Sequence, residues 1–195
     1  MPPLPPVTRA LLLINVAVFF LLPLIGGGLL SIFALWPLGQ NFLPWQIVTY
    51  AFLHGSLSHL FFNMLGLWMF GSELERVWGD KRYLQFYFAC VLAAAATQLI
   101  VTGMMGSVYP TVGASGGLFG LLLAFAMMFP NRIILLFFVI PMKARYLAIL
   151  YGVLELYQGV STSNSGVAHF AHLGGMVGGI GMIRYWRRQS PFRRR

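Results

Sequence analysis

Ser115 stands among small residues, in the run Gly113-Ala-Ser-Gly-Gly117, at the start of an apolar stretch that ends at Phe129. Small neighbours leave the serine hydroxyl accessible, and the first backbone N–H groups of a helix have no acceptor within that helix. Such N–H groups can bind the negative charge that develops on a carbonyl oxygen during acyl transfer. The residue types therefore fit a serine nucleophile beside part of an oxyanion hole.

Two other interpretations of this stretch compete with the catalytic one. Segments rich in glycine and alanine commonly form packing faces between membrane helices. The stretch also matches Gly-x-Ser-x-Gly, the nucleophile elbow of α/β-hydrolases, which needs a preceding strand and a parallel sheet. No strand pattern precedes Ser115, so the elbow is excluded, whereas the packing face stays open on this stretch alone.

Other polar residues interrupt apolar segments, where desolvation is costly and a function is the default explanation. His59 and Asn63 are one helical turn apart and share a helix face. His169 and His172 begin a later segment that continues with glycines, which allow another helix to approach closely. One buried histidine needs no special role, but polar sites in three segments need a joint explanation.

The composition defines the setting of these residues. Of the 195 residues, 58% are hydrophobic and 9% are charged, and the mean hydropathy is +0.78. Such a chain cannot build a charged, soluble surface, and it is expected to be an all-α, multi-pass membrane protein. Six apolar segments predict a six-helix transmembrane bundle: residues 10–25, 57–70, 83–102, 115–129, 146–158 and 167–186.

The basic residues predict the orientation of this bundle. With six spans, all thirteen Lys and Arg fall on the side that holds both termini, and the loops of the other side carry none. By the positive-inside rule the termini are cytoplasmic, including a basic tail at 187–195 that touches anionic lipid head groups. The net charge of +9 is thus explained by the membrane, and no nucleic acid partner is expected.

The first outer loop, residues 26–55, contains no Lys, Arg, Asp or Glu and several aromatic residues, among them Trp36 and Trp45. Amphipathic aromatic side chains are favoured at the membrane interface. The loop is expected either to lie in that interface or to pack over the helix ends.

Counting along the helices tests whether the polar groups can meet. Ser115 is fourteen residues from Phe129 and His59 is fourteen from Glu73, which puts both roughly 21 Å above the cytoplasmic face. His172 is roughly 17 to 21 Å above it. Irregular backbone at such a depth, just before Ser115, is tolerated only where it is buried in protein or lines a water-filled cavity. The common depth favours the catalytic interpretation.

This interpretation assigns roles. His172 is expected to take the proton of Ser115, and His59 and Asn63 are expected to help bind the oxyanion. Glu155 has no motif around it and the other acids lie at the cytoplasmic end, so a Ser-His dyad without an orienting acid is predicted.

Two further residues have weaker assignments. Phe119, one turn after Ser115, is expected either to pack on the imidazole of His172 or to be a plain core residue. His169 lies about 4.5 Å nearer the outer surface than His172 and is expected to be partly wet at the cavity mouth.

These motifs together resemble the rhomboid family of intramembrane serine proteases. They are His54 and His59-x-x-x-Asn63 in the second span, Gly113-x-Ser115-Gly116 opening the fourth, and Ala171-His172-x-x-Gly175 in the sixth. The resemblance implies cleavage of single-pass transmembrane substrates near the outer face of a bacterial inner membrane. It implies Ser115 as nucleophile and His172 as base. No metal cluster is expected, because Cys90 is the single cysteine of the chain, and no cofactor is expected. The family often has a tyrosine where this chain has Phe119.

Two other function classes compete with the protease. An inactive rhomboid-like binder of membrane proteins would be expected to lack the serine or the histidine, and both are present. A haem protein or transporter leaves Ser115 unexplained, and bis-histidine haem ligation needs room between helices that the glycine-rich sixth span does not suggest.

Overall fold

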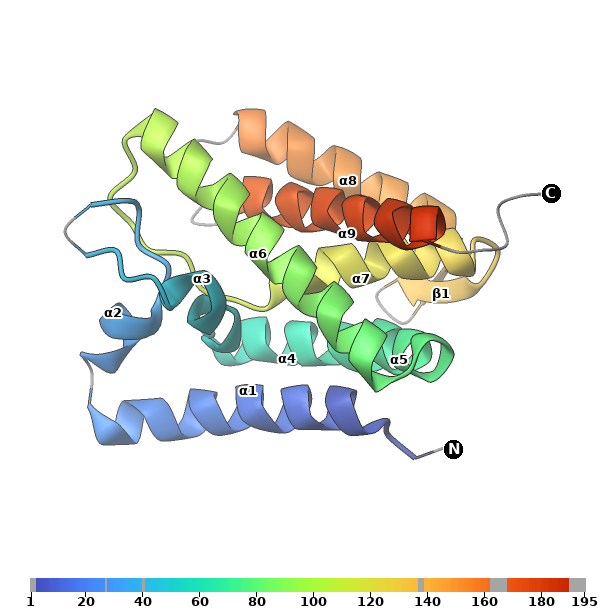
Figure 1. Ribbon diagram of the computed structural model, residues 1–195, viewed down its shortest axis with the longest axis horizontal. Helices are drawn as coiled ribbons and strands as arrows, with labels where there is room; N and C mark the ends of the chain where they lie inside the picture. The colour runs from blue at the N-terminus through green and yellow to red at the C-terminus, as the bar shows by residue number, and fades with distance from the viewer. Residues whose placement is uncertain (1–2, 27, 40, 137–138, 162–167, 190–195) are drawn as a thin grey trace.

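The computed structural model describes residues 3–26, 28–39, 41–136, 139–161 and 168–189. Its long helices lie alongside one another, and both chain termini lie at one end of the molecule (Figure 1). The long helical stretches are α1 (Pro6–Ile25), α4 (Leu57–Gly66) continued by the π-helix η2 (Leu67–Gly71) and α5 (Ser72–Trp78), α6 (Asp80–Met105), α7 (Ser115–Met128), α8 (Ala144–Ser161) and α9 (His169–Gln189).

The chain is mostly helical, so the predicted all-α class is confirmed in large part, and each predicted segment corresponds to one of these helical stretches. The stretch expected at 57–70 continues to Trp78, and the expected start of the last segment at residue 167 lies outside the described residues. Among the described helices, α1 and α6 are long and apolar enough to cross a membrane, and α7 is apolar but shorter. The arrangement of six spans therefore remains a prediction.

Helix α9 packs directly against the backbone of α7. A Cβ atom added at Gly175 would overlap the carbonyl oxygen of Gly116, so only glycine allows this approach. The contact lies one turn after His172, and it brings the first turn of α9 beside the first turn of α7.

Helix α1 is joined to α5 by a buried carboxylate. Glu75 is 1% exposed and accepts hydrogen bonds from the backbone N–H groups of Val7 (2.8 Å) and Thr8 (2.7 Å), and from the Thr8 hydroxyl (2.6 Å). The residue before the helix, Pro5, supplies no side-chain cap. Glu75 therefore satisfies N–H groups that the start of α1 would otherwise leave unpaired.

The outer loop is held together internally by Gln46. It contains α2 (Leu29–Phe33), α3 (Gln46–Thr49) and the 3-10 turn η1 (Tyr50–Phe52). The buried Gln46 amide donates to the carbonyl oxygens of Ile32 and Asn41, both at 3.1 Å, and accepts from the backbone N–H of Trp36 at 3.2 Å. The Tyr50 hydroxyl donates to the Val91 carbonyl oxygen of α6 at 2.9 Å, so the loop packs on the helices, which is one of the two expected arrangements.

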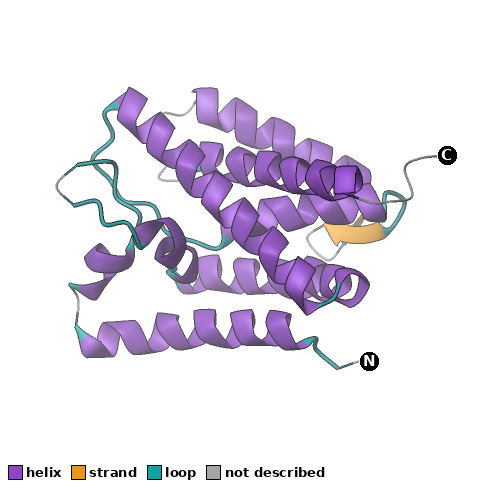
Figure 2. Ribbon diagram, in the orientation of Figure 1, coloured by secondary structure: helices purple, strands orange, loops and turns teal. Residues whose placement is uncertain are grey.

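Within the described residues, the expectation of an all-α chain is wrong between α7 and α8. Strands β1 (Ile133–Leu136) and β2 (Ile140–Lys143) form an antiparallel hairpin, in which Ile133 pairs with Lys143 (Figure 2). Pro130 follows the end of α7, and the apolar, β-branched segment after it is too short for another helix and suits a strand.

Candidate active site

Ser115 is the first residue of α7, and the irregular segment before it is fixed by the outer loop. Thr111 and Leu35 exchange two backbone hydrogen bonds, at 2.8 and 3.0 Å, and the Gly113 N–H donates to the Tyr50 carbonyl oxygen at 2.9 Å. Gly113 has φ +131°, and an added Cβ would lie 2.8 Å from the His59 ring. Only glycine suits this backbone and this space.

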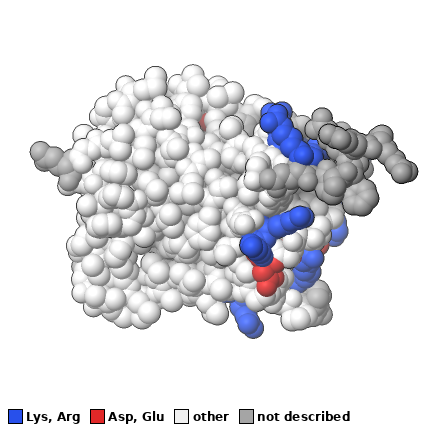
Figure 3. All heavy atoms as spheres, in the orientation of Figure 1, with Lys and Arg blue, Asp and Glu red and all other residues white. Residues whose placement is uncertain are grey.

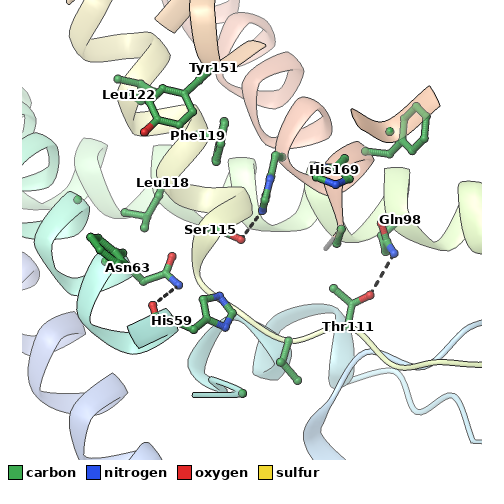
Figure 4. A pocket seen from close by; sticks show the side chains of 18 of the residues that line it. His59, Asn63, Gln98, Thr111, Ser115, Leu118, Phe119, Leu122, Tyr151 and His169 are labelled. Atoms are coloured by element: carbon green, nitrogen blue, oxygen red, sulfur yellow. Dashed lines mark hydrogen bonds between the residues drawn. The ribbon is translucent and has the colours of Figure 1, made fainter. Parts of the chain in front are cut away.

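The Ser115 hydroxyl faces His172. Ser115 Oγ lies 2.7 Å from His172 Nε2, a hydrogen bond marked by the dashed line from Ser115 in Figure 4. The Phe119 ring is stacked on the imidazole, with centroids 4.4 Å apart and planes 3° from parallel, and Tyr151 of α8 meets Phe119 edge-on. The imidazole is thus held between a hydroxyl and an aromatic ring, which is one of the two arrangements expected for Phe119.

His59 and Asn63 lie on α4, which begins at Leu57 because Ser56 caps it by accepting from the His59 N–H at 3.1 Å. Both side chains line the same cavity as Ser115 (Figure 4). Asn63 Nδ2 donates to the His59 carbonyl oxygen at 2.9 Å. An amide nitrogen carries two protons, so the second is available to a group in the cavity.

His54 lies in the loop before α4 and packs behind His59. It is buried, and the two rings meet at an angle of 67° with centroids 5.1 Å apart. Burial, and to a smaller extent the neighbouring His59, lowers the pKa of His54 to about 4, so this side chain is neutral at physiological pH. It supports the position of His59.

The cavity has a volume of about 1550 Å³ and extends along α7. Its wall includes Ser115, His172, His59 and Asn63. Apolar side chains from α4, η2, α7, α8 and β1 also line it, among them Phe62, Met69, Leu122, Leu147 and Leu136. Gln98 and Thr111, whose side chains are hydrogen bonded at 3.1 Å, also lie on its wall. Polar groups near Ser115 thus border a mostly apolar groove.

The expectation that no acid lies beside the base is wrong. Glu155 Oε2 of α8 lies 2.9 Å from His172 Nδ1 and 2.6 Å from His169 Nδ1. The contact with His172 is electrostatic more than a well-aligned hydrogen bond, since the carboxylate lies off the direction of an N–H at Nδ1. His169, expected to be partly wet, is 5% exposed and bonded to this carboxylate.

A signal for Glu155 was present in the sequence. An ionisable side chain within an apolar span is a functional candidate even without a motif. Glu155 is eleven residues from Ala144, the start of α8, which places it about 16 Å along the helix, close to the height calculated for His172. Counting alone leaves open which way the side chain points.

Among the described residues, Glu155, His169 and His172 form the group that most resembles a set of metal ligands. Glu155, His169 and His172 place their ligand atoms within 4.8 Å of one another. Ligands about 2.0–2.1 Å from a tetrahedral Zn²⁺ are about 3.3 Å apart. The separations of 2.6 and 2.9 Å fit direct pairing of carboxylate and imidazole better. The prediction of no metal is unchanged by this geometry.

Comparisons with known proteins agree with the resemblance. The family model for the Rhomboid domain matches residues 41–189. The chain is 34% identical over 183 residues to the mitochondrial Rhomboid protein 1 of Saccharomyces cerevisiae, covering 88% of this chain and 50% of the relative. It is 31% identical over 142 residues to Rhomboid protease GluP of Bacillus subtilis, covering 70% and 25%.

A third relative is Rhomboid protease GlpG of Klebsiella pneumoniae, which is 28% identical over 183 residues, covering 91% of this chain and 62% of the relative. The chain therefore spans between a quarter and about three-fifths of the length of these relatives. The family match and the identity over most of the chain have one meaning: the chain belongs to the rhomboid family, a family of membrane proteins that includes the rhomboid proteases.

Proposed function

We propose that this protein is an intramembrane serine protease that hydrolyses peptide bonds of single-pass transmembrane substrates near the outer membrane face. The observation that carries the proposal is the 2.7 Å contact between Ser115 Oγ and His172 Nε2 inside a cavity bordered by apolar helices. A hydroxyl beside an imidazole is the arrangement that activates a serine for attack on a carbonyl group.

The proposed topology has six spans in one domain covering residues 1–195, with both termini cytoplasmic in a bacterial inner membrane. Its support comes from the charge distribution. The Lys and Arg visible in Figure 3 gather at the end of the molecule where Figure 1 marks both termini. Ser115 begins α7 at the opposite end of that helix from the β1–β2 hairpin, so it faces the uncharged, outer side. The basic tail proposed at 187–195 lies outside the described residues beyond Gln189.

The mechanism starts with proton transfer from Ser115 Oγ to His172 Nε2 as the oxygen forms a bond to the substrate carbonyl carbon. The carbonyl oxygen becomes an oxyanion that the N–H groups of the first turn of α7, the free Asn63 amide proton and His59 can stabilise. When the C–N bond breaks, Nε2–H protonates the leaving amine. Water, activated by the same imidazole, then hydrolyses the acyl-enzyme.

The shape of the cavity supports a membrane-embedded substrate. Apolar residues of both α4 and α8 line it beside α7, so a substrate segment that lies in lipid finds apolar surface on its way to Ser115. Hydrolysis needs water, and the polar side chains around Ser115 provide partners for it.

Labelling by a fluorophosphonate probe tests this function, because such probes react with activated serines. Wild-type protein in detergent should be labelled and should cleave a model single-pass substrate, and Ser115→Ala should do neither. Ser107→Ala is a matched control, since Ser107 lines the same cavity and its hydroxyl accepts from the Tyr109 N–H at 3.4 Å, and it should keep both activities. A wild-type protein that binds the substrate without labelling or cleavage would instead be an inactive rhomboid-like binder.

A further inference from the structure

We infer that Glu155 is a positioning residue for His172, so that Ser115, His172 and Glu155 work as one unit. This inference rests on the proposed function of Ser115 and His172. It starts from an unusual placement: Glu155 is 8% exposed in the middle of α8, between Leu154 and Leu156, which are both exposed on the outside of the bundle. A buried carboxylate is costly unless polar groups compensate it.

Two imidazoles provide that compensation. Glu155 Oε2 is 2.6 Å from His169 Nδ1 and 2.9 Å from His172 Nδ1, and the two rings are perpendicular with centroids 6.4 Å apart. The two histidines are three residues apart on α9, so a single turn of that helix places both Nδ1 atoms beside one oxygen. The shorter contact, with His169, holds the carboxylate in place next to His172.

The contact with His172 has a chemical consequence. A carboxylate beside Nδ1 favours the tautomer with the proton on Nδ1, which leaves the Nε2 lone pair for the Ser115 proton. After that transfer the imidazole is positively charged, and a carboxylate 2.9 Å away stabilises it while itself keeping no proton. The off-axis geometry fits a free enzyme, because catalytic hydrogen bonds are often poorly aligned before substrate binds.

A different role is available to Glu155, and it makes different predictions. The carboxylate could serve only to tie α8 to α9 through His169. In that case replacing Glu155 would lower the melting temperature. Replacing His169 would then lower activity as much as replacing Glu155 does. If Glu155 positions His172, replacing it should lower turnover more than replacing His169 does, because the base itself loses its partner.

The experiment compares Glu155→Gln, Glu155→Asp and His169→Ala with wild type, measuring kcat, KM, the rate of fluorophosphonate labelling and the melting temperature. Glu155→Gln should lower kcat and the labelling rate about 10- to 1,000-fold, less than the ~10⁴-fold of a Ser-His-Asp triad because the contact is off-axis. KM and the melting temperature should change little. Glu155→Asp keeps the charge and should retain more activity than Glu155→Gln, and His169→Ala should lose less activity than Glu155→Gln. Gln158→Leu, at an exposed position of the same helix, is the matched control and should match wild type.

Two outcomes would overturn the inference: wild-type kcat and labelling in Glu155→Gln, or equal losses in Glu155→Gln and His169→Ala with a lowered melting temperature in both. Ser115→Ala, measured beside these variants, separates this failure from that of the proposed function. If wild type shows activity that depends on Ser115 and Glu155→Gln keeps it, only the role of Glu155 is wrong.

Discussion

Glu75 and Glu155 are both buried glutamates, but the groups that meet them differ. Glu75, at the end of the molecule that holds the chain termini, accepts hydrogen bonds from two backbone N–H groups and one hydroxyl of α1. Glu155, in the other half of the bundle, meets the ring nitrogens of two histidines. Backbone N–H groups cannot gain or lose a proton during catalysis, whereas imidazoles can. The first carboxylate is therefore suited to holding helices together, and the second to supporting a base.

This difference predicts that Glu75 contributes to stability and Glu155 to the rate of the reaction. Changes around Glu75 should alter stability without altering the rate of the folded enzyme. Changes around Glu155 and the residues it touches should alter the rate without unfolding the protein. Measuring both kcat and the melting temperature of each variant tests this comparison. A change around Glu75 that lowers the rate, or a change around Glu155 that lowers only stability, would contradict it.

Removing His172 should have the largest effect. His172→Ala should lower cleavage by on the order of 10⁴-fold or more and abolish fluorophosphonate labelling of Ser115, because an unactivated serine is a poor nucleophile. The melting temperature should stay near that of wild type. His169→Ala should keep a substantial part of both activities. If His169 proved essential and His172 dispensable, the base would be misassigned.

Removing Asn63 should have the next largest effect on rate. Asn63→Ala should lower kcat on the order of 10- to 1,000-fold with a smaller change in KM, since an oxyanion donor acts mainly in the transition state. Asn15→Ala is a matched control, because Asn15 of α1 makes the same bond to the carbonyl oxygen four residues earlier, at 2.7 Å. An unchanged kcat for Asn63→Ala would reduce its role to packing.

Replacing Glu75 should act on stability alone. In Glu75→Gln the amide presents N–H groups to the N–H groups of α1, which should cost about 1.5–3 kcal/mol and lower the melting temperature by about 3–12 °C. The value of kcat per folded molecule should match wild type. Glu73→Gln is the control on the same helix, since Glu73 is only half-buried and its pair with Arg76 at 3.3 Å should contribute little. A fall in kcat for Glu75→Gln without a fall in melting temperature would contradict the structural role.

The sequence predicted quantities that depend on distance along a helix. The rise per residue placed Ser115 and His172 at one height, and the glycine pattern predicted the close approach that Gly175 provides. Both follow from local rules. The motif from Ser115 to His172 also led to the family, which the comparisons confirm.

The features that the sequence left undetermined depend on how each helix is rotated about its axis and on which distant residues pack against it. The position of Glu155 along α8 could be counted, but whether its side chain faced lipid or α9 depends on how α8 is turned against its neighbours. The bonds of Glu75 join residues 67 and 68 positions apart, and no local pattern marks such a pair. The β1–β2 hairpin was missed because a short apolar segment fits a strand or a helix end equally well.

Phe119 should have the smallest effect, and it sharpens the distinction between holding a base and activating it. Its ring is stacked 4.4 Å from the His172 imidazole, and such ring pairs contribute about 0.5–1.5 kcal/mol beyond their buried area. Phe119→Leu removes the flat partner while keeping an apolar side chain, so kcat should fall about 2- to 12-fold through a less ordered imidazole. Phe119→Tyr keeps an aromatic ring and introduces the residue that is often found in the family, so it should keep wild-type turnover. If Phe119→Leu lowered kcat as much as Glu155→Gln, ring packing would orient His172 as strongly as the carboxylate does. Glu155 would then not be the main residue that positions the base.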